Sequence, residues 1–319
     1  MKTLEDFTNF YKTALLADLK TLEQERRKII SKLTYVIVTI LCILGACLLV
    51  LWANSRIAPP FLFIPVILCI ITGAVICHFM TKGYVARFKS LVIRKIVRFI
   101  DENLNYNADE CIDKTTFMLS KIFTTKPNRY KGDDLVWGKT GATKIKFSEI
   151  KAEHESGSGK NRRRYTIFKG LFFIGDFNKH FTCETVVLPD TAEKLFGHFG
   201  QKLQSMNIFR GQLIKLEDPE FENHFVVYGD DQIQARYILS TSLMERIVDF
   251  RKKTGRKIYL SFVGSKVFVA VSYTKSLFEP RLFRTLLDFE PVREYFEDLQ
   301  LTIGIVDDLN LNTRIWSKQ

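Results

Sequence analysis

Two long apolar runs constrain the fold of this chain more than any other feature. They cover Leu33–Ala53 and Phe61–Met80, and neither contains Asp, Glu, Lys or Arg. A helix of about 20 residues spans roughly 30 Å, the thickness of the hydrocarbon core of a bilayer. Because lipid offers backbone groups no hydrogen-bonding partners, both runs should be helical. Only residues 54–60 separate them, so we predict an antiparallel transmembrane hairpin over residues 33–80. A buried core hairpin of a soluble protein is the alternative.

Basic residues flank both apolar runs and predict the orientation of the hairpin. Lysine and arginine concentrate on the cytoplasmic side of membrane proteins. The connecting loop carries Arg56 alone, whereas the flanks carry Arg26, Arg27, Lys28 and Lys32 before the first run and Lys82, Arg87, Lys89, Arg94, Lys95 and Arg98 after the second. We therefore expect two spans with both termini in the cytoplasm. The first run is too long, and lies too far from Met1, to be a cleavable signal peptide.

The charge balance points to lipid rather than to nucleic acid. The 319 residues carry a formal net charge of +12. Residues 1–100 hold 14 Lys and Arg against 5 Asp and Glu, and the remaining residues hold 33 against 30. The positive excess thus surrounds the apolar runs, where it can contact anionic headgroups. A nucleic-acid-binding domain would carry its own basic face, so we expect no nucleic acid partner.

The residues on either side of the hairpin have the periodicity of amphipathic helices. In residues 1–32 the apolar stripe is formed by Leu15, Leu19, Leu22 and Ile29, and a similar stripe follows Lys82. We predict a cytoplasmic amphipathic helix over residues 1–32 and stalk helices over residues 81–125, the last of them from Ala108 to Phe123. Two helices that lie flat on the inner leaflet are the alternative.

Residues 126–319 have the composition of an antiparallel α+β domain. Segments rich in β-branched and aromatic residues predict strands, and they are Leu135–Lys139, Thr143–Glu153, Tyr165–Phe177, Phe181–Leu188, Gly211–Leu216, His224–Tyr228, Lys257–Phe262 and Ser265–Ser272. Helices are expected over residues 189–204, over residues 240–253 and from Phe278 onward, with a turn at Glu290–Pro291. The fold class is therefore α+β, in which a membrane hairpin and a stalk precede a cytoplasmic sheet domain with peripheral helices. That domain is either one unit or two, divided near residues 205–210.

No motif gives positive support for catalysis or for a cofactor. Gly132–Thr140 ends in Gly-Lys-Thr like a phosphate-binding loop, but five residues separate its glycines, where that loop has four. Three Asp-Asp pairs occur, at Asp133–Asp134, Asp230–Asp231 and Asp307–Asp308. Neighbouring side chains of a strand point to opposite faces, so turn and N-cap roles explain such pairs better than an acid–base site. We expect no catalytic residue, no metal and no cofactor, with a divalent ion held by several loops as the alternative.

The residues best suited to partner contact lie in a loop and a turn. Glu155–Asn161 has the composition of a flexible hairpin loop, and the basic tract Lys160–Arg164 overlaps its end. Because binding surfaces concentrate on loops, we assign partner or lipid contact to Lys160, Arg162, Arg163, Arg164, Asp230 and Asp231. Solvated loop charge is the alternative explanation of the basic tract.

Six segments carry a family resemblance. They are Ile167–Phe173, Asp176–Lys179, Leu216–Phe221, Val227–Tyr237, Ser242–Arg246 and Ile303–Val306. They resemble the bacterial family known as domain of unknown function 3137. The resemblance implies an integral inner (plasma) membrane protein with a cytoplasmic domain, and it supplies no established reaction. Members of the family are often encoded beside LemA-type membrane proteins, so a LemA-type protein is a candidate partner.

Our hypothesis is a non-enzymatic, membrane-anchored scaffold or adaptor that self-associates or binds a partner membrane protein. The near-neutral soluble domain supports it, as do the small residues of the hairpin, which allow close helix packing in lipid: Gly45, Ala46, Gly73 and Ala74. A membrane-bound ligand sensor or enzyme that uses the acidic turns is the first alternative. A transport accessory subunit is the second, although the two spans offer few polar residues to line a pore.

Overall fold

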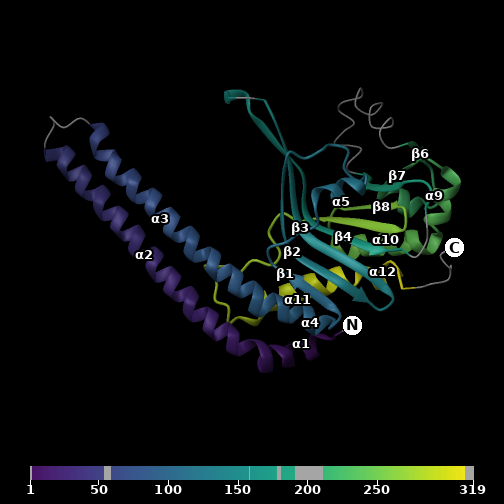
Figure 1. Cartoon of the computed structure of the whole chain (residues 1–319), viewed down its shortest axis with the longest axis horizontal. Helices are drawn as coiled ribbons and strands as arrows, with labels where there is room; N and C mark the ends of the chain where they lie inside the picture. The colour runs from purple at the N-terminus through teal and green to yellow at the C-terminus, as the bar shows by residue number, and fades with distance from the viewer. Residues whose placement is uncertain (1, 54–58, 158, 178–180, 191–210, 313–319) are drawn as a thin grey trace. The chain divides into compact units, whose positions relative to one another are not determined.

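The chain forms two units in the computed structural model, which describes residues 2–53, 59–157, 159–177, 181–190 and 211–312 (Figure 1). The helical unit comprises Lys2–Ile96 and Phe278–Phe296, and the sheet unit comprises Val97–Leu277 and the chain from Glu297 onward. The side chains at positions 48, 51–53, 59–66, 69 and 160 also lie outside the description. The helix expected over residues 189–204 lies almost entirely outside the described residues, and so does the boundary expected near 205–210.

Helices form the N-terminal part of the helical unit. Their bounds are α1 Leu4–Phe10, the π-helical turn η1 Tyr11–Leu15, α2 Leu16–Ala53, α3 Pro59–Phe88, the π-helical turn η2 Lys89–Ile93 and α4 Arg94–Ile100. Thr3 caps α1, because its Oγ1 accepts the Asp6 N–H at 3.1 Å while Asp6 Oδ2 accepts the Thr3 N–H at 2.9 Å. This capping box satisfies two N–H groups that a helix start leaves unpaired. Helix then runs from Leu4 to Ala53 without a break.

The environment of this helical run changes along its length. Leu15, Leu19 and Leu22 are fully buried, whereas Leu41 and Leu49 are 61% and 68% exposed. Within the described residues, one helical run is long and apolar enough to cross a membrane, and it extends from Leu4 to Cys47. Its continuously apolar part begins at Leu33, where the burial ends. A large exposed apolar surface of this kind marks contact with a membrane or with a partner.

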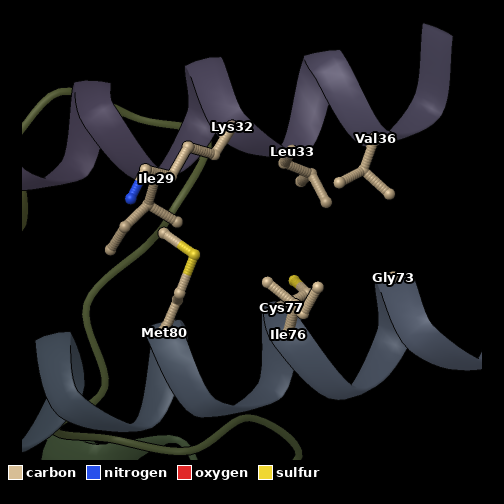
Figure 2. Close-up of a pocket in the computed structure, with 8 residues that line it drawn as sticks. All are labelled: Ile29, Lys32, Leu33, Val36, Gly73, Ile76, Cys77 and Met80. Carbon is tan, nitrogen blue, oxygen red and sulfur yellow. The ribbon is translucent and has the colours of Figure 1, made fainter. Parts of the chain in front are cut away.

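Helices α2 and α3 lie side by side and run in opposite directions (Figure 1). Figure 2 shows the residues that meet between them: Ile29, Lys32, Leu33 and Val36 from α2, and Gly73, Ile76, Cys77 and Met80 from α3. A Cβ atom added to Gly73 would lie 2.6 Å from Cγ1 of Val36, closer than two carbon atoms can approach. Glycine at position 73 therefore allows the two backbones to pack closely, as small residues do between membrane helices.

One antiparallel sheet organises the described part of the sheet unit. Its nine strands follow the order β1-β2-β3-β4-β9-β8-β5-β7-β6. The strands are β1 Leu104–Asn107, β2 Arg129–Thr140, β3 Thr143–Ser156, β4 Arg163–Asp176, β5 Thr185–Pro189, β6 Gln212–Ile214, β7 Phe225–Gly229, β8 Ile258–Val263 and β9 Lys266–Ser272. Strands from both sides of residues 205–210 thus belong to one sheet, and the α+β class is confirmed.

Further helices follow along the chain. They are α5 Lys114–Leu119, α8 Pro219–Glu222, α9 Gln232–Ile238, α10 Thr241–Thr254, α11 Phe289–Ile303 and α12 Ile305–Asp308, and α11 begins in the helical unit. Phe117 of α5 packs on the sheet, with its ring centroid 5.1 Å from those of Phe123 and Phe172. These aromatic side chains belong to the apolar core over β3, β4 and β9.

The stalk helices expected over residues 81–125 end early. Helix continues only to Ile100, residues 104–107 form strand β1, and the helix expected over Ala108–Phe123 is confined to Lys114–Leu119. Leu104 and Tyr106 are buried while Asn105 is exposed, so the segment alternates as an edge strand does. Pairing with β2 satisfies its backbone groups outside any helix.

The helix expected from Phe278 onward begins only at Phe289. Glu290–Pro291, expected to form a turn, lies instead in the first turn of α11, where proline needs no N–H partner. In the segment before α11, the backbone groups of Leu282 and Leu286 bond to side chains of α2. Contacts distant in sequence therefore replace the local hydrogen bonds of a helix.

Candidate functional site

A two-stranded arm, residues 154–165, extends beyond the rest of the sheet. Strand β2 pairs with β3 only as far as the pair Arg129–Glu153, and β9 pairs with β4 only from Gly170 inward. Beyond these points β3 and β4 pair with each other alone (Figure 1). A two-stranded hairpin in water is marginally stable by itself. The arm therefore depends on side-chain contacts at its base.

The base of the arm is held by the segment that precedes β2. The Asn128 amide donates from Nδ2 to the Glu155 carbonyl at 2.6 Å and accepts the Glu155 N–H at 2.9 Å. His154 Nδ1 lies 3.0 Å from the Lys126 carbonyl oxygen. These bonds join β3 at the base of the arm to the segment before β2, where β2 itself no longer pairs with β3.

The Glu155 carboxylate gathers three guanidinium groups. Arg129 Nε lies 2.7 Å from Oε2, Arg164 Nη2 lies 3.2 Å from the same oxygen, and Arg162 Nε is paired with Oε1. The Glu155 side chain is only 10% exposed, whereas those of the arginines are 44–56% exposed. Three positive charges surround one negative charge, so the cluster keeps an excess of two. Arginine presents five donors in a planar fork, which suits phosphate and carboxylate oxygens.

Two of the residues predicted for partner contact, Arg162 and Arg164, belong to this cluster. Arg163 pairs in register with Ser156, one position along the strand, and so points to the other face of the arm. The side chain of Lys160 lies outside the described residues. Neither Arg129 nor the central role of Glu155 was predicted from the sequence, because only the strand register brings positions 129 and 155 together.

Asp230 and Asp231, also predicted for partner contact, lie elsewhere. Asp231 is the N-cap of α9, and its Oδ1 accepts the N–H groups of Ile233 at 2.8 Å and Gln234 at 3.1 Å. Asp230 lies against Gly211, whose φ is +79°. Both follow β7, which three strands separate from β4 in the sheet order. The structure therefore does not join them to the arginine cluster and gives Asp231 the capping role that its residue type favours.

A second group of charged residues lies on the sheet face opposite the apolar core. Asp133 and Asp134 of β2 and Glu149 of β3 have carboxylate oxygens within 4.8 Å of one another. The expectation that adjacent aspartates point to opposite faces is wrong for this pair. The pairing register of β2 shifts between Asp133 and Val136, and Asp134 has a φ of +58°, so the bulge turns both side chains toward Glu149.

This carboxylate cluster is tied into the fold. Asp134 is fully buried and accepts a hydrogen bond from the Tyr106 hydroxyl, and Glu149 accepts the Leu277 N–H at 2.8 Å. Oxygen ligands of this kind suit a divalent cation, but the hydrogen bonds give the buried carboxylates a structural role as well. Burial, with Asp133 nearby, raises the pKa of the Cys111 thiol. Among the described cysteines, Cys111 and Cys183 are both free.

The segment Gly132–Thr140 lies within β2 and has no following helix that could bind phosphate. Gly138 instead lies against Asn103 and Leu104 near the paired edge strand β1. The phosphate-binding loop that the Gly-Lys-Thr sequence imitates needs backbone N–H groups converging at a helix start. Position 132–140 therefore offers a strand and no nucleotide cradle in the described part of the chain.

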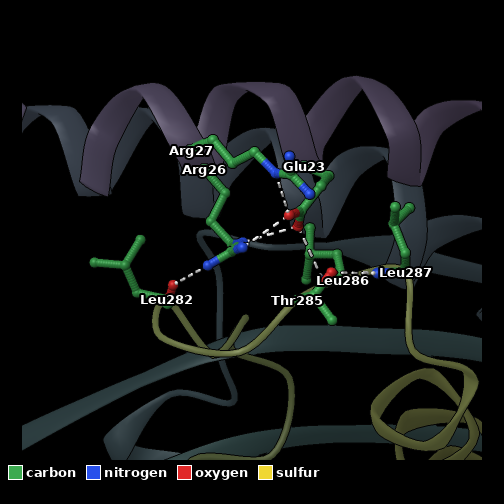
Figure 3. Close-up of polar contacts among 7 residues, drawn as sticks. All are labelled: Glu23, Arg26, Arg27, Leu282, Thr285, Leu286 and Leu287. Atoms are coloured by element: carbon green, nitrogen blue, oxygen red, sulfur yellow. Dashed lines mark hydrogen bonds and ion pairs between the residues drawn. The ribbon is translucent and has the colours of Figure 1, made fainter. Parts of the chain in front are cut away.

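A deeply buried ion pair lies in the helical unit (Figure 3). Glu23 accepts hydrogen bonds from Arg26 Nε at 2.8 Å and Nη2 at 2.7 Å, from Arg27 Nε at 3.0 Å and from the Leu286 N–H at 3.1 Å. Arg26 also donates from Nη1 to the Leu282 carbonyl at 2.8 Å. These bonds, above all those from Arg26, lower the pKa of Glu23 to about 2. We call this group the Glu23 knot.

The Glu23 knot links the segment before α11 to α2. Aromatic contacts add to this link. Phe7 of α1 stacks on Phe296 with ring centroids 4.1 Å apart and planes at 7°. The Tyr11 hydroxyl donates to the Leu287 carbonyl at 2.9 Å. Residues near both ends of the chain thus hold the base of α2 in one packed arrangement.

Comparison with known proteins finds a family model that is similar to part of this chain. Residues 166–311 match the family model described as Protein of unknown function (DUF3137). The matched segment comprises 146 of the 319 residues, a little less than half of the chain. The match confirms the resemblance seen in the sequence, and it runs from Thr166 in β4 to Leu311, just past the end of α12. No curated protein matches the chain.

One solved structure with low similarity is the crystal structure of the mycobacterial trehalose monomycolate transport factor A, TtfA. It shares 8% sequence identity with this chain at a TM-score of 0.29, and the match covers 66% of this chain and 95% of that one. So low a score carries no argument about fold or function.

The DUF3137 match includes some of the site residues described above and leaves out others. Leu282, Leu286 and Asp231 lie within residues 166–311. Glu23 and the three arginines of the arm lie outside them. The family match therefore adds no role for the arm or for the carboxylate that the knot surrounds.

Proposed function

We propose that this chain is a membrane-anchored scaffold or adaptor with two spans, α2 and α3, and with both termini in the cytoplasm. The observation that carries the proposal is the change along α2 from fully buried leucines to leucines exposed by more than half. Phe79 on α3 is likewise 70% exposed. A bilayer would cover these apolar side chains, and the basic residues on both flanks would stay on the cytoplasmic side.

The Glu23 knot supports a rigid attachment of the membrane anchor rather than a flexible one. It binds the cytoplasmic end of α2 to residues 282–286, which return from the far end of the sequence. Fixing a charged pair and a backbone segment together restricts the motion of the anchor relative to that segment. A protein that presents a surface to partners at a membrane benefits from such a fixed base.

Association is the second part of the proposal. The anchored chain self-associates or binds another membrane protein, and a LemA-type protein is the partner that the family resemblance suggests. Among the described residues, no heavy atom lies within 4 Å of a Cβ added to Gly45, so a neighbouring helix could approach α2 closely at this glycine. No catalytic residue, metal or cofactor is part of the proposal.

The test combines a reporter assay of membrane topology with a measurement of the mass of the purified protein. A reporter that is active only outside the cytoplasm should be active when inserted near Ser55 and silent when fused after Gln319. The purified full chain in mild detergent should have a protein mass that is a multiple of 37.1 kDa or includes one partner in fixed ratio. Changing Gly45 to Leu should reduce that mass, while Gly83→Leu, at another helical glycine with open space, serves as the control. A monomer without a stoichiometric partner would refute the scaffold role, and reversed reporter activities would refute the topology.

A further inference from the structure

The arm of residues 154–165 carries an unusual concentration of positive charge. It contains Lys160, Arg162, Arg163 and Arg164 against the single carboxylate of Glu155. Arg129 adds a fifth cation at its base. Like charges held together repel one another, so a folded arm of this composition gains stability when an anion neutralises it.

The geometry of the cluster leaves this charge available. Glu155 holds Arg129, Arg162 and Arg164 in place, and about half of each arginine side chain remains exposed. Guanidinium groups fixed in this way lose little conformational entropy when they bind phosphate oxygens. Because β2 and β9 end before the arm begins, neither neighbouring strand covers either of its edges.

We propose that the arm binds the phosphodiester headgroups of anionic phospholipids at the surface of the membrane. The inference rests on the proposed anchoring and names lipid as the ligand of the arm. Residues 81–96 connect the proposed second span to the sheet unit, and as helix they extend over about 24 Å. A tether this short keeps the sheet unit close to headgroups, at an effective concentration in the millimolar range or above.

Tyr165, at the base of the arm, also suits a membrane surface. Tyr165 is 48% exposed and contacts His154, with ring centroids 5.4 Å apart. Tyrosine rings settle at the level of the headgroups, where an apolar ring and a hydroxyl are both satisfied. Each well-placed cation near an anionic membrane favours the bound state about fivefold, so three arginines together favour it about 100-fold.

Hydrogen–deuterium exchange of the full chain in lipid nanodiscs tests the proposal. The exchange rate of amides 154–165 is compared between discs of phosphatidylcholine alone and discs that also contain phosphatidylglycerol. We expect at least tenfold slower exchange in the anionic discs at low salt, and loss of the difference at about 0.5 M salt, where screening is strong. Because each variant is compared with itself in neutral discs, any intrinsic loosening of the arm cancels.

The variant R162Q/R164Q removes two cations of the cluster and should abolish most of the difference between the two lipids. The control is K144Q/K266Q, which removes the same charge from exposed positions of the sheet unit outside the arm. It should keep the full difference. Equal loss in both variants would show a general charge effect and overturn the assignment to the arm.

Two further exchange measurements in neutral discs test whether the arm instead binds a small anion or an acidic protein. Inorganic phosphate that protects the arm as strongly as phosphatidylglycerol would indicate a site for small anions and overturn the lipid proposal. Polyglutamate that protects the arm when phosphatidylglycerol does not would indicate an acidic protein partner and overturn it as well. An anchored chain with equal exchange in both lipids refutes only the role of the arm, whereas a chain that does not enter the discs refutes the anchoring too.

Discussion

Replacing Glu23 by glutamine tests the part of the structure that joins the two ends of the sequence. The carboxylate binds Arg26 and Arg27 and accepts the Leu286 N–H. Glutamine keeps the size of the side chain but removes its charge, so Arg26 stays buried without its anion. Breaking a buried ion pair by removing one partner typically costs about 3–5 kcal/mol.

The pKa of Glu23 gives an independent magnitude. It falls from 4.5 to about 2 in the folded chain. Each pKa unit corresponds to about 1.4 kcal/mol, so the ionised carboxylate contributes about 3 kcal/mol. Because the folded pKa is the lower one, this contribution is complete above about pH 4.5 and disappears as the pH falls toward 2. The stabilising effect of Glu23 relative to glutamine should therefore shrink over that interval.

Exchange of the Leu286 amide hydrogen, measured on the full chain in mild detergent, directly reports the stabilisation that Glu23 provides. In E23Q a loss of about 3 kcal/mol corresponds to about 150-fold lower protection of that amide near neutral pH. The matched control is E25Q, which removes a carboxylate that pairs with Arg87 at 2.6 Å on the surface. Exposed pairs contribute about 0–1 kcal/mol, so E25Q should change the protection fivefold at most. Equal effects of the two changes, or an E23Q effect that persists unchanged near pH 2, would refute the reasoning.

Two further predictions concern the sheet unit, and denaturant unfolding of the full chain in mild detergent measures both. Tyr106→Phe removes the hydroxyl that donates to the buried Asp134 carboxylate and should destabilise the fold by about 1–3 kcal/mol, whereas Tyr165→Phe on the exposed arm should change stability by less than about 0.5 kcal/mol. A similar small effect of both changes would show that the hydroxyl is not needed. Asp231→Ala removes the N-cap of α9 and should cost about 1 kcal/mol, more than Asp230→Ala; the reverse order would contradict the capping role.

Local features of the sequence predict much of the secondary structure. Alternation around Gly264, whose φ is +62°, predicts the β8–β9 hairpin, and the helix ending before Gly255 is found as expected. Where prediction failed, a distant partner changed a local preference. Leu104–Asn107, expected within the stalk helices, pairs with β2 instead, and residues 282 and 286, expected in a helix, bond with α2.

The candidate site was likewise predicted only in part from the sequence. Composition alone indicated that the basic tract Arg162–Arg164 could bind an anion, because its charge is a property of neighbouring residues. It could not indicate that Arg129 joins the tract around Glu155, since that depends on the register of β2, β3 and β4. The bulge that turns Asp133 and Asp134 toward Glu149 is likewise invisible in the sequence.

The sequence by itself determined that the chain has a long apolar helix with basic flanks, followed by an antiparallel α+β part, because hydropathy and periodicity act over a few turns or residues. Only the tertiary structure decided which charges meet. Glu23 and Leu286 are brought together by packing, as are Arg129 and Glu155, although each pair is far apart along the chain. Electrostatic energy falls off with distance in space rather than in sequence, so the properties of both sites follow from the fold.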